Sequence, residues 1–330
     1  SVNAQKALFA DISAIEVVDP ATIRIVLARP NGDFLFNLAW GDAVIVAPES
    51  AAGNATAPVG TGPFRFVEWG KGDHVDIVRN PDYWGTPAKL ESATFKFIGD
   101  PTAAFAALMA EDIDAFPNFP APETLAQFAN DPRFEVVVGS TEGETILAMN
   151  NARPPLDNAK VREAIAHAID RQAIIDGAMF GYGTPIGTHF APHHPDYVDL
   201  TGQSDHDPEK ARQLLAEAGV GEVTLSLKLP PVEGYARRGG EIIASQLEAV
   251  GIKTQTTNLE WAQWLEQVFG GKDFDLTIIS HTEPLDINIY GRDDYYFGYN
   301  SEAFKQIMTD LGNETDPAKA QKELDRICHE

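Results

Sequence analysis

Residues 223–280 alternate between strand-like and helix-like segments, with short connections throughout. The first segment, VTLSLKL, alternates apolar and polar side chains as a half-buried strand does. The pattern predicts strands at residues 223–229, 253–257 and 275–280, and helices at residues 239–250 and 261–269. Because parallel strands need a crossover connection, this order predicts a parallel sheet with right-handed crossovers.

A sheet of this kind binds ligands at the carboxyl ends of its strands. Three loops meet there, one after each of the three predicted strands. In the first loop, Arg237 can hold a carboxylate through two parallel hydrogen bonds, and an acidic side chain in the third loop can accept from an ammonium group. Aromatic side chains beside them can contact the rest of a ligand. The predicted ligand-binding residues are Tyr235, Arg237, Trp261, Trp264, His281, Glu283, Asp286 and Tyr290, with Asn150 at the boundary between the two halves of the chain.

Ordinary structural roles compete with this prediction. An arginine near a helix start is most often a solvated surface charge. Trp261 and Trp264 lie three residues apart and share a helix face, so one is expected in the core, and we favour Trp264. Glu283 and Asp286 can instead cap the segment that follows them.

The first half of the chain has a different, β-rich pattern. Residues 64–69 (FRFVEW) and 74–79 (HVDIVR) alternate around a Gly-rich turn and predict a hairpin. Asp100 is placed to cap a helix that begins at Pro101, and residues 134–138 (FEVVV) predict a further strand.

The order of several short motifs resembles family 5 of the extracellular solute-binding proteins, the peptide, opine and nickel-chelate receptors of ABC importers. Matching motifs follow one another in family order along most of the chain. They are GTGPF at 60–64, EWGKGD at 68–73, RNPDYW at 79–84, NNARPPLDN at 150–158, VREAIAHAIDR at 161–171, GYGTP at 181–185 and DPEKA at 207–211. The resemblance implies an α/β, two-lobed fold like that of the periplasmic binding proteins (type II, large cluster C class). It also implies a partial chain that begins inside the first lobe and ends inside the second.

The resemblance further implies a domain organisation. Residues 1–58 would be the remainder of a small subdomain of lobe I, residues 59–142 its β-rich core, and residues 143–330 the α/β domain of lobe II, incomplete at its C-terminus.

The implied function is capture of a solute between the lobes for delivery to the permease subunits of an ABC transporter in the inner membrane. An oligopeptide or dipeptide is the expected solute, with a glycoside, an opine or a metal chelate as alternatives. Dipeptide receptors carry Ala-Arg-Arg at the matching helix start, which implies carboxylate recognition by Arg237 and ammonium recognition by Glu283 or Asp286. The implied protein is a monomer without cofactor, periplasmic, or lipid-anchored and extracellular in a Gram-positive source.

Composition excludes several other classes. The formal net charge is −24 and no basic block occurs, which argues against nucleic-acid binding. One cysteine, Cys328, allows no internal disulfide, and no apolar run is long enough to span a bilayer.

The sequence carries no G-x-S-x-G, P-loop or H-E-x-x-H motif, so we do not predict an enzyme. A hydrolase that uses Glu283 and Asp286 as paired carboxylates is the alternative class. The histidines that could suggest a metal lack the spacing of a zinc site, so no metal ligands are predicted among them; they are His189, His193, His194, His206 and His281.

Overall fold

The computed structural model describes residues 4–41, 43–282, 286–314 and 316–329. The chain divides into two compact units, one of residues 1–10 and 33–135 and the other of residues 11–32 and 136–330. The resemblance predicts residues 11–32 in lobe I, whereas their contacts group them with the second unit. The predicted domain boundaries therefore remain a proposal drawn from the resemblance.

The first unit is built around an antiparallel sheet in the order β3-β4-β5. The predicted hairpin is present, and its turn contains Gly72 at a φ of +82°, a left-handed conformation that glycine adopts without strain. The predicted helix start is also confirmed, because the Asp100 carboxylate accepts a hydrogen bond of 2.7 Å from the Ala103 N–H. The elements of this unit are η1 (Ala4–Phe9), α1 (Phe34–Ala39), α2 (Pro48–Ala51), β3 (Phe64–Gly70), β4 (His74–Arg79), β5 (Ser92–Lys96), α3 (Pro101–Met109), η2 (Pro122–Thr124) and α4 (Leu125–Ala129).

The prediction of a strand at residues 134–138 is wrong. These residues adopt no strand, and Val137 and Val138 are 80% and 65% exposed. Alternation of apolar side chains produces a strand only where a neighbouring strand supplies hydrogen bonds, and no strand within the described part of the chain pairs with this segment.

The second unit contains a two-stranded antiparallel ribbon, β1-β2, and a four-stranded sheet in the order β6-β9-β7-β8. In this sheet β7 runs parallel to β8 and β9, and β6 is antiparallel to β9. The predicted parallel arrangement is thus confirmed. The elements are β1 (Ile12–Asp19), β2 (Thr22–Leu27), β6 (Glu144–Met149), α5 (Ala159–Ala168), α6 (Arg171–Met179), η3 (Thr201–Ser204), α7 (Pro208–Glu217), β7 (Val223–Leu229), η4 (Glu233–Arg238), α8 (Gly239–Glu248), β8 (Ile252–Asn258), α9 (Trp261–Trp264), η5 (Leu265–Gly270), β9 (Leu276–His281), η6 (Asp286–Gly291), α10 (Glu302–Asn313) and α11 (Pro317–His329).

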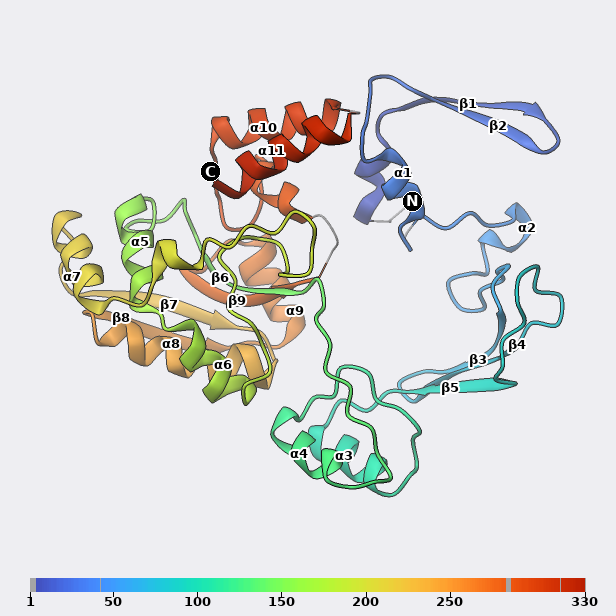
Figure 1. Ribbon diagram of the computed structural model, residues 1–330, viewed down its shortest axis with the longest axis horizontal. Helices are drawn as coiled ribbons and strands as arrows, with labels where there is room; N and C mark the ends of the chain where they lie inside the picture. Colours follow the sequence, from blue (N-terminus) through green and yellow to red (C-terminus); the bar gives the residue numbers. More distant parts are fainter. Residues whose placement is uncertain (1–3, 42, 283–285, 315, 330) are drawn as a thin grey trace. The chain divides into compact units, whose positions relative to one another are not determined.

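Both faces of this sheet are covered. From β7 the chain passes through α8 to β8 on one side, and from β8 through α9 to β9 on the other side of β7. Right-handed crossovers in opposite directions place their helices on opposite faces. Accordingly, Leu276 and Ile278 of β9 pack in one core with α5, α7 and α8, while Ile279 packs in a second core with Trp264. Figure 1 shows α8 running along this sheet.

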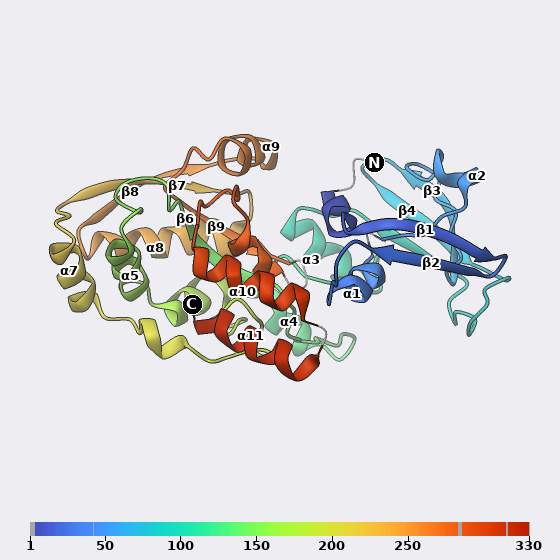
Figure 2. The same cartoon turned by 90° about the horizontal axis from the view of Figure 1, so that it is seen from above.

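A third, smaller core joins the last two helices. Helices α10 and α11 lie side by side (Figures 1 and 2), and Phe304, Ile307 and Ile327 pack between them and against Phe190. This pairing brings the end of the chain next to the loop that precedes α7. Among the described residues no helix has the length and apolar character needed to cross a membrane.

Candidate functional site

A cavity of about 1080 Å³ lies within the second unit, beside the carboxyl end of β9. Its volume is at the upper end of the range for small-molecule sites. Leu147, Met149 and Ile278 form part of its apolar floor, and Ser280 and Thr282 lie at the strand end. The site therefore lies at the edge of the sheet that the sequence analysis selected.

The cavity follows the outer edge of β6. This strand is the last in the sheet order, and among the described residues β9 is the one strand that pairs with it. Side chains from both faces of β6 line the cavity, Thr145 and Leu147 on one face and Glu144 and Ile146 on the other. Successive side chains of a strand point to opposite faces, so a space that touches both faces must border the strand's backbone edge.

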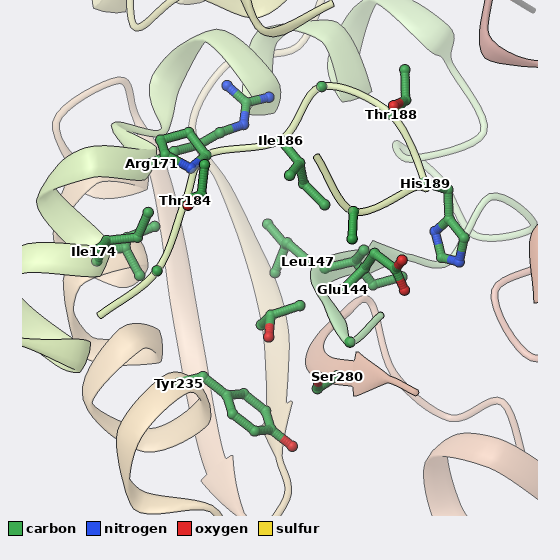
Figure 3. Close-up of a pocket in the computed structure, with 18 of the residues that line it drawn as sticks. Glu144, Leu147, Arg171, Ile174, Thr184, Ile186, Thr188, His189, Tyr235 and Ser280 are labelled. Carbon is green, nitrogen blue, oxygen red and sulfur yellow. The ribbon is translucent and has the colours of Figure 1, made fainter. Parts of the chain in front are cut away.

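Polar side chains enter the cavity from β6, from the loop after α6 and from the end of β9 (Figure 3). Glu144 is 4% exposed and lies opposite His281 in the strand register. Tyr290 Oη is 3.3 Å from His189 Nδ1, and the imidazole ring of His189 meets that of His281 edge-on at 5.9 Å. A carboxylate, an imidazole and a phenol, from Glu144, His189 and Tyr290, therefore line a mostly apolar cavity, and the ring of His281 lies beside that of His189.

Tyr235 lines the cavity from the turn that follows β7. Burial raises the pKa of its phenol, and a hydrogen bond with the backbone of Ser280 partly offsets that effect. The hydroxyl thus stays protonated at neutral pH and can donate. Residues from the loops after β7 and β9 meet here because these strands are neighbours in the sheet.

The wall opposite β6 is the irregular segment 181–192 together with α6. Arg171 anchors this wall, since its Nη1 and Nη2 donate to the backbone oxygen and the hydroxyl of Ser204 at 2.9 and 2.7 Å. Burial lowers the pKa of the Arg171 guanidinium, although an arginine stays charged throughout the physiological range. The two hydrogen bonds indicate a structural role for Arg171.

Gly187 lies where this wall crosses another part of the chain. A Cβ atom at this position would lie 2.3 Å from both the Leu200 carbonyl carbon and the Thr201 backbone nitrogen, a distance that no real contact allows. We expect Gly187→Ala to lower the free energy of unfolding by about 1–3 kcal/mol, because the two backbones must move apart. Urea denaturation followed by circular dichroism measures this. Gly202→Ala is the control, since open space surrounds its Cβ position; equal losses in the two variants would contradict the steric argument.

Arg237 and Trp261 lie at the same sheet edge but are not among the residues that line the cavity. Arg237 Nη2 is 3.7 Å from Glu260 Oε1, an ion pair without a hydrogen bond. Its Nε is buried and has no hydrogen-bond partner in the described part of the chain. Trp261 is 44% exposed on α9. The Arg237 side chain as a whole is 31% exposed, so solvent reaches part of both side chains at this edge.

Trp264, His281 and Asn150 are buried in the fold. Trp264 Nε1 donates to Thr277 Oγ1 at 3.0 Å, and His281 stacks on Tyr296. Asn150 follows β6, whose end pairs with the beginning of β9, so it lies at the sheet edge opposite the carboxyl ends of β7 and β9. Its Nδ2 donates to the backbone oxygens of Lys272 and Phe274, both at 3.1 Å. The structure does not bring Asn150 together with the other predicted residues.

The acidic candidates are only partly described. Glu283 lies outside the described residues, and Asp286 is the first residue of η6. Glu144 and Ser280 are not among the predicted ligand-binding residues, and the sequence pattern raised His189 only as a possible metal ligand. Glu144 could have been noticed as a carboxylate that begins an otherwise apolar strand, whereas the position of His189 depends on a loop without regular structure.

Comparison with known proteins decides the family. The family model described as "Bacterial extracellular solute-binding proteins, family 5 Middle" matches residues 2–300. The chain belongs to this family. The resemblance drawn from the motifs is therefore confirmed, and family 5 is a family of solute-binding proteins.

Relatives in family 5 have several named ligands. The chain is 33% identical to a glutathione-binding protein of Salmonella choleraesuis over 271 residues, which cover 80% of this chain and 52% of that protein. It is 29% identical to the dipeptide-binding protein of Escherichia coli over 79% of this chain and 51% of that protein. It is 30% identical to heme-binding protein A of Haemophilus influenzae, with 79% and 50% covered. The chain thus spans about half the length of these relatives.

Solved structures show the same fold. A periplasmic binding protein of Helicobacter pylori associated with an ABC transporter, in complex with the peptide STSA, superposes with a TM-score of 0.86 at 22% identity, over 100% of this chain and 68% of that one. The oligopeptide-binding protein of Bacillus subtilis, in complex with a nonapeptide, gives a TM-score of 0.81 at 24% identity, over 98% and 70%. The predicted α/β fold class of the two-lobed periplasmic binding proteins is confirmed.

Proposed function

We propose that the protein is the solute-binding component of an ABC importer and that its solute is an oligopeptide or dipeptide. Membership of family 5 supports the receptor role. The observation that carries the peptide assignment is the cavity along the outer edge of β6.

An extended peptide can bind to a strand edge through its main chain, while pockets take alternate side chains. The outer edge of β6 borders the cavity, and no strand in the described ranges pairs with it. The apolar floor at Leu147, Met149 and Ile278 suits an apolar peptide side chain. Ser280 and the Tyr235 hydroxyl supply polar contacts at one end.

The termini of a peptide need charged partners. Arg237 lies at the same sheet edge as the cavity with its side chain 31% exposed, and we assign its guanidinium to the peptide carboxylate. Glu283 or Asp286 is assigned to the ammonium group. Delivery would be to permease subunits in the inner membrane, from a monomeric receptor in the periplasm, or from a lipid-anchored extracellular one in a Gram-positive source.

Binding can be tested by thermal unfolding of the protein against dipeptides, tetrapeptides, glutathione, heme, agropinic acid and nickel–histidine. A ligand that binds only the folded state adds about 2.7 kcal/mol of stability at a concentration of 100 Kd. We expect the largest rise in melting temperature with a peptide, and recovery of that peptide unchanged. A tetrapeptide methylated at its backbone nitrogens is the matched control, and it should bind more weakly because it cannot donate to β6.

Two results would contradict the proposal. Stabilisation by heme, opine or nickel–histidine with none by peptides would assign a different solute within the family. Cleavage of the bound peptide would replace the receptor with the hydrolase alternative.

A further inference from the structure

Three side chains on the β3–β4 hairpin of the first unit form a cluster that solute binding does not use. Glu68 lies directly opposite Asp76 in the strand register, and His74 lies opposite Gly70. One ligating atom from each of Glu68, His74 and Asp76 falls within 4.8 Å of the others. In the sequence Glu68 lies six positions before His74, and His74 lies two positions before Asp76. The antiparallel register brings the three side chains together.

The distances match those between neighbouring ligands of a small dication. His74 Nε2 lies 3.3 Å from Glu68 Oε1 and 3.8 Å from Asp76 Oδ2. Two ligand atoms bound to Zn²⁺ at 2.0–2.2 Å in tetrahedral geometry are roughly 3.3 Å apart. Glu68 is the most exposed of the three, at 64%, and can adjust by rotating its side chain.

Neighbouring groups orient two of the ligands. Asp73 Oδ2 lies 2.7 Å from His74 Nδ1 and can accept a hydrogen bond from a proton there, so Nε2, which faces the other carboxylates, is the nitrogen that a metal ion would bind in place of its proton. The Thr94 hydroxyl, on β5, donates to Asp76 Oδ1 at 2.6 Å and leaves Oδ2 directed at His74. Protein metal sites commonly pair a ligating histidine with a second carboxylate in this way.

The imidazole ring of His74 is also held in place by the backbone. A Cβ atom at Gly70 would lie 2.7 Å from His74 Cε1, so the ring lies directly over this glycine. The His74 side chain is 24% exposed. Its position depends on a glycine that no other residue type can replace without moving the ring.

We propose that Glu68, His74 and Asp76 bind a divalent transition-metal ion of the Zn²⁺ class. One imidazole nitrogen and two carboxylates are a ligand set that Zn²⁺ accepts, with water at the remaining position. The two carboxylates neutralise the charge of the dication. This site lies in the first unit and is independent of the cavity in the second unit.

The test is a competition titration of Zn²⁺ against a chromophoric chelator, with the full chain and no peptide present. We expect one Zn²⁺ per chain, and a loss of affinity of about tenfold or more in His74→Gln and in Asp76→Asn. Thr94→Val keeps all three ligands and should weaken binding by about tenfold through the orientation of Asp76. The matched control is His193→Gln, because His193 is also an exposed histidine beside a carboxylate, with Nε2 2.6 Å from Glu142 Oε1.

Unchanged Zn²⁺ affinity in His74→Gln, or a loss in His193→Gln alone, would overturn the proposal. The alternative is that His74 is an imidazolium paired with the surrounding carboxylates, and it predicts no Zn²⁺ binding at this hairpin. Circular dichroism without metal checks that each variant folds, and Asp76→Asn, which keeps the side-chain shape, serves if His74→Gln does not fold. Because no peptide is present, failure of the peptide assignment leaves this result unaffected.

Discussion

Trp264→Ala will lower the free energy of unfolding of the second unit by about 3–5 kcal/mol. The indole is 4% exposed and packs with Val268, Phe274 and Tyr296 in the core on one face of the sheet. Its removal leaves a cavity that rigid sheet neighbours cannot fill, and it deletes the hydrogen bond to Thr277 Oγ1. Urea denaturation followed by circular dichroism measures the loss.

Trp261→Ala is the matched control on the same helix. The two indoles meet edge-on at 5.9 Å, but Trp261 is 44% exposed. Its truncation should cost about 1 kcal/mol or less, because little apolar area is removed from the core. Trp264→Phe separates packing from hydrogen bonding and should cost about 1–2 kcal/mol. Equal losses for the two alanine variants would show that the burial difference does not control stability here.

Arg237→Ala will weaken binding of a peptide with a free carboxylate by about 2–4 kcal/mol. The loss arises because the ligand carboxylate would remain desolvated without its partner. Stability of the free protein should change little, since the buried Nε makes no hydrogen bond within the described ranges and the ion pair with Glu260 spans 3.7 Å. Calorimetry with the peptide identified by the thermal screen measures the change.

Two controls sharpen this test. Lys253→Ala also removes one positive charge from the second unit, at an exposed ion pair with Glu222, and should leave affinity unchanged. The C-terminal amide of the same peptide lacks the carboxylate, so Arg237→Ala should affect its binding far less. If Arg237→Ala weakens binding of the free-acid peptide and of its C-terminal amide equally, Arg237 has a role other than binding the carboxylate.

The sequence predicted much of the second unit because its signals are local. Strand β7 occupies residues 223–229, as the alternation indicated, and α8 begins at Gly239, where the predicted helix 239–250 begins. Periodicity and capping reflect interactions within a few residues, so they are readable from one segment at a time. The strand prediction for residues 134–138 was wrong because alternation alone does not reveal whether a partner strand exists.

The candidate site was predictable only to the level of a sheet edge. Parallel strands and crossover handedness follow from general rules, so the sheet edge could be predicted, and the predicted residues Tyr235 and Tyr290 line the cavity there. Whether a given residue enters the cavity depends on packing between loops. Thus Trp264 packs into the core, Asn150 lies at the opposite edge, and the irregular segment 181–192 brings His189 to the cavity.

By itself, then, the sequence determined the family, the parallel sheet and the edge at which a ligand is expected. Tertiary structure alone decided that β6 is an edge strand with a cavity along it, and that Glu68, His74 and Asp76 meet on one hairpin. The physical reason is that local patterns encode burial along a segment. Contacts between segments depend on strand register and on which neighbours compete for the same space.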